Sequence, residues 1–145
     1  MKKIFRNIPS LMPKLMVFVF MMALGTNLNA QVDKSDKDGN VVYTVVDKEA
    51  SYPGGAEAMT TFLAQNIIYP TLAKQKNTQG KVILSFIVEK DGSISNIKVI
   101  RDIGEGCGEE GVRIVKLMPK WKPAQQGGKA VRQQFVLPVS FRLTK

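Results

Sequence analysis

The stretch from Gly80 to Ile100 constrains the fold more than any other part of this 145-residue chain. Alternating apolar residues share one side of its first half, namely Val82, Leu84, Phe86 and Val88. Period-two alternation is typical of a strand with one well-buried face. The pair Asp91-Gly92 follows, and such a pair between β-rich runs favours a tight turn. We therefore predict a β-hairpin, with a bulge near Ser95-Asn96 where the apolar phase slips.

Helical spacing is present on both sides of this hairpin in the sequence. Residues 56–66 place Met59, Phe62, Leu63 and Asn66 on one face. Residues 109–118 place Gly111, Ile114, Val115 and Met118 on a stripe that we expect to be buried, with Arg113 and Lys116 toward water. Residues 71–76 are expected to add one helical turn, and residues 41–46 (VVYTVV) a leading strand. Residues 125–128 are expected to form a loop.

The last predicted strand runs from Val131 to Leu143 and has an unbroken alternating apolar face, formed by Phe135, Leu137, Val139, Phe141 and Leu143. Pro138 lies within it, and because proline cannot donate to a ladder, it belongs on an edge strand. An exposed edge admits two readings. Pro138 can protect the edge against aggregation, or the edge can be a docking site for an extended peptide.

Composition excludes several kinds of chemistry. The chain has 21 basic and 12 acidic residues, a formal charge of +9, no histidine and one cysteine, Cys107. Without histidine, the usual general base and most zinc sites are missing. The basic residues form no block with interleaved aromatics, so we do not predict nucleic-acid binding. We also predict no enzymatic activity, no metal site and no cofactor, because nothing positions a substrate.

Residues 1–30 have the features of a secretory signal. A basic start precedes an apolar run from Leu15 to Gly25, and Leu28-Asn29-Ala30 is a plausible cleavage end. We predict cleavage after Ala30 and an exported protein. The alternative is an uncleaved anchor, although a spanning helix needs about 20 apolar residues. A mature chain that begins at Gln31 would exclude the anchor.

The assembled motifs resemble the TonB C-terminal domain family. The resemblance covers about residues 50–145 and runs through Tyr69-Pro70, Gln79-Gly80-Lys81-Val82, the turn sequence 88–94 (VEKDGSI), Trp121-Lys122-Pro123 and the closing segment 136–141 (VLPVSF). It implies an α+β fold: a small antiparallel sheet of about three main strands, plus an N-terminal strand, with two helices packed on one face. The expected organisation is a signal in 1–30, a polar spacer and leading strand in 31–50, and the domain in 51–145.

The resemblance also implies a role. Family members bind the TonB box, an extended segment of an outer-membrane receptor, by β-strand addition and support energised uptake. By position, the implied partner-binding residues are Arg132, Gln134, Val136, Ser140, Arg142, Asn66, Ile67 and Ile68. Full transducers carry an anchor with a histidine and a long Pro-rich spacer. This chain has no histidine and no proline in residues 31–50, so contact with inner-membrane motor proteins is expected only if the N-terminus remains an anchor.

The sequence therefore predicts an exported, non-enzymatic domain that binds TonB-dependent receptors or related envelope partners through its last strand. The first alternative is a short, membrane-anchored energy transducer. The second is a structural module in which the same strand pairs with its own copy to give a homodimer.

Overall fold

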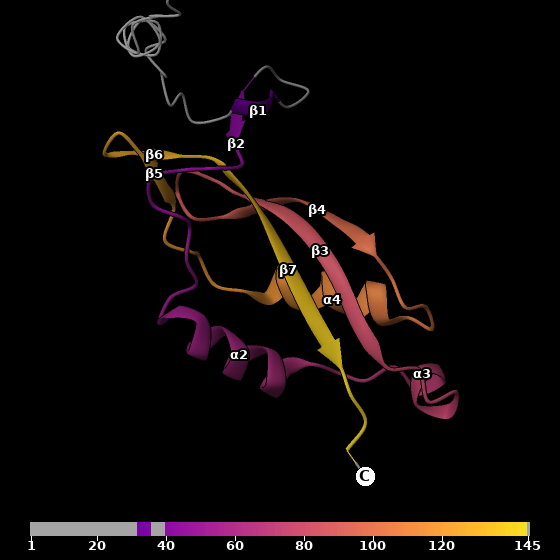
Figure 1. Ribbon diagram of the computed structural model, residues 1–145. Coiled ribbons are helices and arrows are strands. Elements are labelled where there is room, and N and C mark those ends of the chain that lie inside the picture. The colour runs from indigo at the N-terminus through magenta and orange to yellow at the C-terminus, as the bar shows by residue number, and fades with distance from the viewer. Residues whose placement is uncertain (1–31, 36–39, 145) are drawn as a thin grey trace, which may run out of the picture.

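The structure of the chain is a computed structural model that describes residues 32–35 and 40–144 (Figure 1). The predicted signal peptide lies outside the described residues. The elements follow in the order β1 (Val32–Ser35), β2 (Val41–Tyr43), α2 (Gly55–Asn66), α3 (Thr71–Gln75), β3 (Gly80–Val88), β4 (Ile94–Arg101), α4 (Cys107–Leu117), β5 (Ala124–Gln126), β6 (Lys129–Val131) and β7 (Gln133–Phe141).

The predicted hairpin is confirmed as the antiparallel pair of β3 and β4. Its turn is closed by a hydrogen bond from the Gly92 N–H to the Glu89 carbonyl, 2.9 Å long. Gly92 has a φ of 84°, which glycine adopts without a Cβ clash. The predicted bulge is also present. The register moves by one residue between the pairs of Ser85 and Ile87, and Asn96 adopts a φ of 51° at that point.

The sheet has the strand order β1-β2-β7-β3-β4. β7 pairs antiparallel with β3 along its full length, from Gln133 opposite Val88 to Phe141 opposite Gly80. β2 pairs parallel with β7 at one position, Tyr43 opposite Gln133. The predicted α+β class is confirmed: β3, β4 and β7 are the main strands, and the N-terminal strands join at one side.

The helices α2 and α4 lie on one side of the sheet, as Figure 1 shows, while α3 is a short turn before β3. α4 packs closely because Gly111 faces β3, where an added Cβ would lie 2.9 Å from a methyl carbon of Leu84. The predicted buried stripe is borne out at Gly111, Ile114 and Val115. Arg113, which we expect to face water, is 39% exposed, and its guanidinium also donates hydrogen bonds to the buried Glu110 carboxylate.

The core lies between the sheet and these helices. Its largest fully buried side chains include Phe86, Phe141, Leu84 and Ile114. Trp121 is 3% exposed, and its ring lies edge-on to Phe86 and Phe135 at centroid distances of 5.4 and 4.9 Å. Aromatic pairs of this geometry each contribute about 0.5–1.5 kcal/mol beyond simple burial.

Several elements differ from the sequence prediction. Residues 125–128 are part of a hairpin of β5 and β6, and Gly127 and Gly128 supply its turn with positive φ. The leading strand ends at Tyr43, because the chain then turns away to form isolated bridges between Lys48 and Gln125 and between Ser51 and Lys122. The last strand runs from Gln133 to Phe141 rather than from Val131 to Leu143, since Val131 belongs to β6 and Leu143 lies beyond the end of β7.

Candidate strand-docking edge

The edge of β7 that faces away from β3 is open over most of its length. β2 meets this edge only at Gln133, through the pairing with Tyr43. From Gln134 to Phe141, no other strand of the described ranges 32–35 and 40–144 pairs with it. β7 therefore lies inside the sheet at its start and at the sheet edge from there on (Figure 1).

Pro138 determines which backbone groups point outward. It lies opposite Ile83, and because proline has no N–H, this pair is of the non-hydrogen-bonded type in the antiparallel ladder. The backbone groups of every second residue then point the same way as those of Pro138. Val136 and Ser140 consequently offer N–H donors at the open edge, and the carbonyls of Val136, Pro138 and Ser140 offer acceptors.

The side chains of β7 alternate between the two faces of the sheet. Leu137, Val139 and Phe141 are buried toward the helices, whereas Gln134, Pro138 and Ser140 are exposed on the opposite face. Val136 is 50% exposed on that opposite face. None of the described helices lies on that opposite face of the sheet in Figure 1. The predicted site residues Gln134, Val136 and Ser140 are thus accessible along the open edge, and Arg142 is exposed directly after it.

Arg132 has a different environment from the other predicted site residues. It precedes β7, and its side chain is only 14% exposed. Its guanidinium donates to both carboxylate oxygens of Glu89, at 2.6 Å and 3.0 Å. These hydrogen bonds lower the pKa of Glu89, against the opposing effect of burial. Arg132 therefore joins the start of β7 to the end of β3 and is not displayed to a partner in this arrangement.

We expect the Glu89–Arg132 pair to make stability depend on acidic pH. Because the folded-state pKa of Glu89 lies below its ordinary value of 4.5, its contribution is complete above that value and is lost as the pH falls through the folded pKa. Glu89→Gln should cost about 1–3 kcal/mol at pH 7 and flatten the fall in unfolding free energy below pH 4.5. Urea unfolding across pH 3–7 measures this, with Glu49→Gln, at an exposed position, as the control. Parallel pH curves for the unsubstituted protein and Glu89→Gln would contradict it.

The segment Asn66-Ile67-Ile68 begins at the last residue of α2 and is held against α4. The Ile68 N–H donates to the Glu110 carboxylate at 2.6 Å, and the Arg113 guanidinium donates to the Asn66 carbonyl at 2.7 Å. Burial raises the pKa of Glu110, but the bonds from Arg113 and Ile68 outweigh it and leave the pKa lowered. A carboxylate that stays ionised is thus a stable anchor for this segment.

The same segment leads to the far end of β7. The next residue, Tyr69, places its ring edge-on to Phe141 with a centroid distance of 5.6 Å, and its hydroxyl donates to the Thr78 carbonyl. Ile67 packs against the core, while the Ile68 side chain is 63% exposed. The segment and the last residue of β7 therefore meet at one end of the open edge.

Two features of this edge are absent from the sequence interpretation. The first is Tyr43, whose pairing with Gln133 limits where the open stretch begins. The second is α2, which runs beside the open edge in Figure 1. The four-residue spacing of Met59 and Leu63 marks an apolar stripe on α2, but spacing alone does not show which surface a stripe faces.

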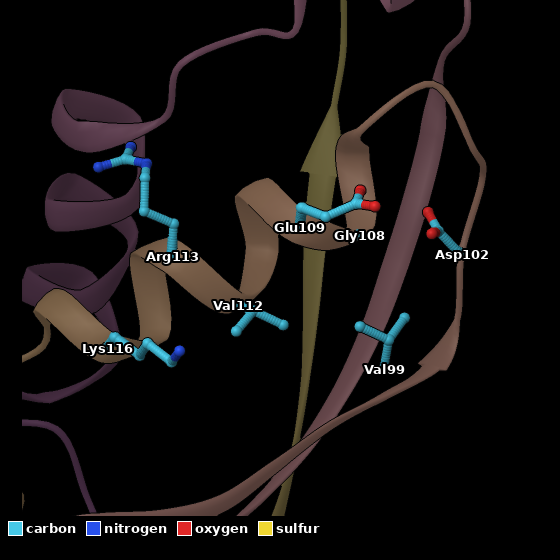
Figure 2. Close-up of a pocket in the computed structure, with 7 residues that line it drawn as sticks. All are labelled: Val99, Asp102, Gly108, Glu109, Val112, Arg113 and Lys116. Carbon is cyan, nitrogen blue, oxygen red and sulfur yellow. The ribbon is translucent and has the colours of Figure 1, made fainter.

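A separate groove lies between α4 and β4, with a volume of about 460 Å³. It is lined by Val99, Asp102, Gly108, Glu109, Val112, Arg113 and Lys116. Figure 2 shows Arg113 pointing away from the other lining residues, toward α2. Across residues 32–35 and 40–144, no group of three or more His, Cys, Asp or Glu side chains is arranged to hold a metal. The groove is on the β4 side of the sheet and is not part of the β7 edge.

Cys107, at the start of α4, is fully buried. Burial raises the pKa of its thiol, and the nearby Asp102 and Glu105 carboxylates add to the effect. A raised pKa reduces the fraction of reactive thiolate.

Within the part of the chain that the structure describes, no helix has the length and apolarity needed to cross a membrane.

Known proteins resemble this chain in sequence and in fold. Protein TonB of Pseudomonas aeruginosa is 30% identical over 80 residues, which are 54% of this chain but 23% of that protein. The chain thus spans about a quarter of that relative's length. Two solution structures of the Helicobacter pylori TonB C-terminal domain have TM-scores of 0.44 and 0.41. They show 20% and 21% identity, cover 64% and 61% of this chain, and are themselves covered to 88% and 94%.

The family comparison extends over more of the chain than any single motif. The model of the Gram-negative bacterial TonB protein C-terminal region matches residues 65–143, which is more than half of the chain. The match begins just before the Asn66–Ile68 segment and ends just after β7, so it includes both ends of the open edge. The chain belongs to the family of TonB C-terminal domains.

Proposed function

We propose that this protein is a non-enzymatic binding domain of the cell envelope, which captures an extended segment of a partner by adding it as a strand to β7. The observation that carries the proposal is the open stretch of β7 after Gln134, where no strand of the described ranges pairs with the outward backbone donors of Val136 and Ser140. Backbone pairing supplies affinity in strand addition, and side-chain pockets supply specificity.

The partners that we propose are TonB-dependent outer-membrane receptors, through their TonB-box peptides, and the role is support of energised transport. The basis is membership of the TonB C-terminal domain family, together with the likeness to a protein named TonB. We further propose a periplasmic location after cleavage at Ala30, and an interaction with inner-membrane motor proteins only for an uncleaved, anchored form.

A titration of the isotope-labelled protein with N-terminal peptides of TonB-dependent receptors tests this proposal. We expect the backbone amides of Val136 and Ser140 to show the largest shifts, because their N–H groups would gain acceptors. The amides of Leu137 and Val139 should move less, since the ladder directs them toward β3. If no receptor peptide binds, or if the shifts cluster on β4 instead, the proposed docking edge is wrong.

A second candidate is self-association, which the same observation favours, because an open edge can pair with its own copy. A homodimer would make the β7 amide shifts depend on protein concentration without any peptide. Sedimentation at high micromolar concentration separates the two functions. A monomer there supports the receptor proposal and contradicts the homodimer.

A further inference from the structure

The helix α2 has an apolar stripe that the fold covers only in part: Ala58, Met59 and Phe62 pack against the core, whereas Leu63 is not among the residues that do so. Its members at helical spacing are Ala58, Met59, Phe62 and Leu63, and every one of them is partly exposed. No residue of this 12-residue helix is buried, whereas the 11-residue α4 buries six. An amphipathic helix of a folded domain normally buries its apolar stripe against the core. α2 therefore retains apolar surface that a further element can cover.

The position of α2 indicates what can cover this surface. In Figure 1, α2 runs along the side of β7 that faces away from β3, and the close-up from the α4 side in Figure 2 shows the same order from α2 through β7 to β3. A strand added to β7 would lie about 4.8 Å beyond it. The helix-facing side chains of that strand would then meet the uncovered stripe of α2.

The spacing of the stripe matches a strand. Met59 and Leu63 are four residues apart, which is about 6 Å along a helix axis. Side chains at positions i and i+2 of a strand are separated by about 6.6 Å on one face. Two apolar residues at i and i+2 of an added strand would therefore lie over Met59 and Leu63. Leu63 is available for such a contact, since it is not among the half-buried residues that pack against the core.

The opposite face of the edge carries unpaired positive charge. Lys81 lies directly opposite Ser140 in the ladder, and Arg142 follows two residues later. Both side chains are exposed, and neither has an ion-pair partner within the described ranges. A carboxylate of the partner on this side would be complementary to both cations, with an attraction that weakens as salt is raised.

We infer that α2 forms the second wall of the docking site, and that the site selects an extended partner segment with two apolar residues at i and i+2 facing the helix and a carboxylate on the other face. This inference rests on the proposed function, because it requires a strand on β7. It adds the side-chain chemistry of the partner, which the backbone edge does not specify.

A designed peptide tests the inference. The blocked heptapeptide Thr-Glu-Val-Thr-Val-Glu-Thr reads the same in both directions, so its pattern does not depend on strand polarity. We expect it to bind at least about fivefold more tightly than Thr-Glu-Thr-Thr-Thr-Glu-Thr, because two valines cover the stripe. We expect Thr-Gln-Val-Thr-Val-Gln-Thr to bind more weakly at low salt and nearly as well at high salt.

The matched variants are Leu63→Gln on the stripe and Leu117→Gln at the exposed end of α4. Both replace a partly or largely exposed leucine with a good helix former. Leu63→Gln should weaken binding of the valine peptide about five- to tenfold, and Leu117→Gln should leave it unchanged. In ¹³C-methyl spectra of the full chain, the methyl signal of Met59 should move on binding, whereas that of Met118, after α4, should not.

The outcomes separate the inference from the proposed function. If the Val136 and Ser140 amides move but Leu63→Gln binds as well as Leu117→Gln, the role of α2 is overturned and the docking edge stands. If neither receptor peptides nor the valine peptide move those amides, both ideas fail. If the Met59 methyl moves with protein concentration alone, the stripe is covered by a second copy of the chain, and the peptide inference is overturned.

Discussion

Val136→Pro should reduce the affinity for a receptor peptide at least about tenfold while the protein stays folded. In the open stretch of β7, two backbone donors point outward, at Val136 and Ser140, because Pro138 between them has none. Proline at position 136 removes one of the two and places a ring where the partner's carbonyl would dock. A lost hydrogen bond is worth about 0.5–1.5 kcal/mol, and with the steric effect the total reaches the 1.4 kcal/mol of a tenfold change.

The fold should tolerate this substitution because position 136 contributes no donor to the ladder with β3. Its partner there is Ser85, in the same non-hydrogen-bonded class as the pair of Pro138 and Ile83. Pro138 itself shows that this strand accepts proline at an outward position. We expect a loss of unfolding free energy below about 2 kcal/mol, since neither a ladder bond nor a core side chain is removed.

Val136→Thr is the matched control, because it keeps the N–H group and a β-branched side chain. Its affinity for the same peptide should stay within about twofold of that of the unsubstituted protein. The measurement is a titration monitored by amide shifts, with far-UV circular dichroism to verify the fold. Equal affinities for Val136→Pro and Val136→Thr would mean that the partner does not pair with the backbone of β7.

The β7 edge shows how much local pattern alone can predict. The alternation from Phe135 to Phe141 predicts the strand and its buried face. Pro138 predicts that the strand lies at the sheet edge. Both predictions depend only on the backbone geometry of neighbouring residues. Arg132 continues the same alternation, so the sequence places it in the predicted strand from Val131 to Leu143. Its structural environment is set by Glu89, 43 residues earlier, which neutralises it in an ion pair. No local pattern contains that partner.

The same contrast applies to the strands around the edge. The sequence VVYTVV predicts a strand of six residues, yet only Val41–Tyr43 pairs, and Val45 is 59% exposed. Its length is limited by where the following chain must go, since Lys48 and Ser51 bridge to the segment around β5. Likewise, Gly127-Gly128 indicates a turn, but the short strands that it joins are too polar to show alternation. Strand propensity needs a partner before it produces a strand.

Gly92→Ala should destabilise the protein by at least about 3 kcal/mol, a large part of the 5–15 kcal/mol typical of a folded domain. Gly92 forms the β3–β4 turn with a φ of 84°, and a Cβ built there would lie 2.0 Å from the carbonyl oxygen of Trp121. Its own carbonyl accepts the Trp121 N–H at 2.8 Å. The turn therefore touches the backbone of Trp121 and cannot accommodate a side chain without moving it.

The cost has two parts that a control can separate. Gly104 has nearly the same φ, 83°, but an added Cβ there would have no neighbour within 4 Å. Gly104→Ala should therefore show only the backbone strain, about 1–2 kcal/mol. Gly92→Ala should exceed it by at least about 2 kcal/mol, because displacing Trp121 disturbs its contacts with Phe86 and Phe135.

Urea unfolding of both variants measures this difference, followed by the fluorescence of Trp121, the single tryptophan, and by circular dichroism as a signal independent of that ring. Equal losses of unfolding free energy for the two variants would mean that the Trp121 backbone can move away from the turn at little cost. A larger loss at Gly92 would show that the hairpin and the Trp121 loop are locked together. The Trp121 ring packs against the Phe135 ring of β7. The contact between Gly92 and the Trp121 backbone would then also hold the docking edge in place.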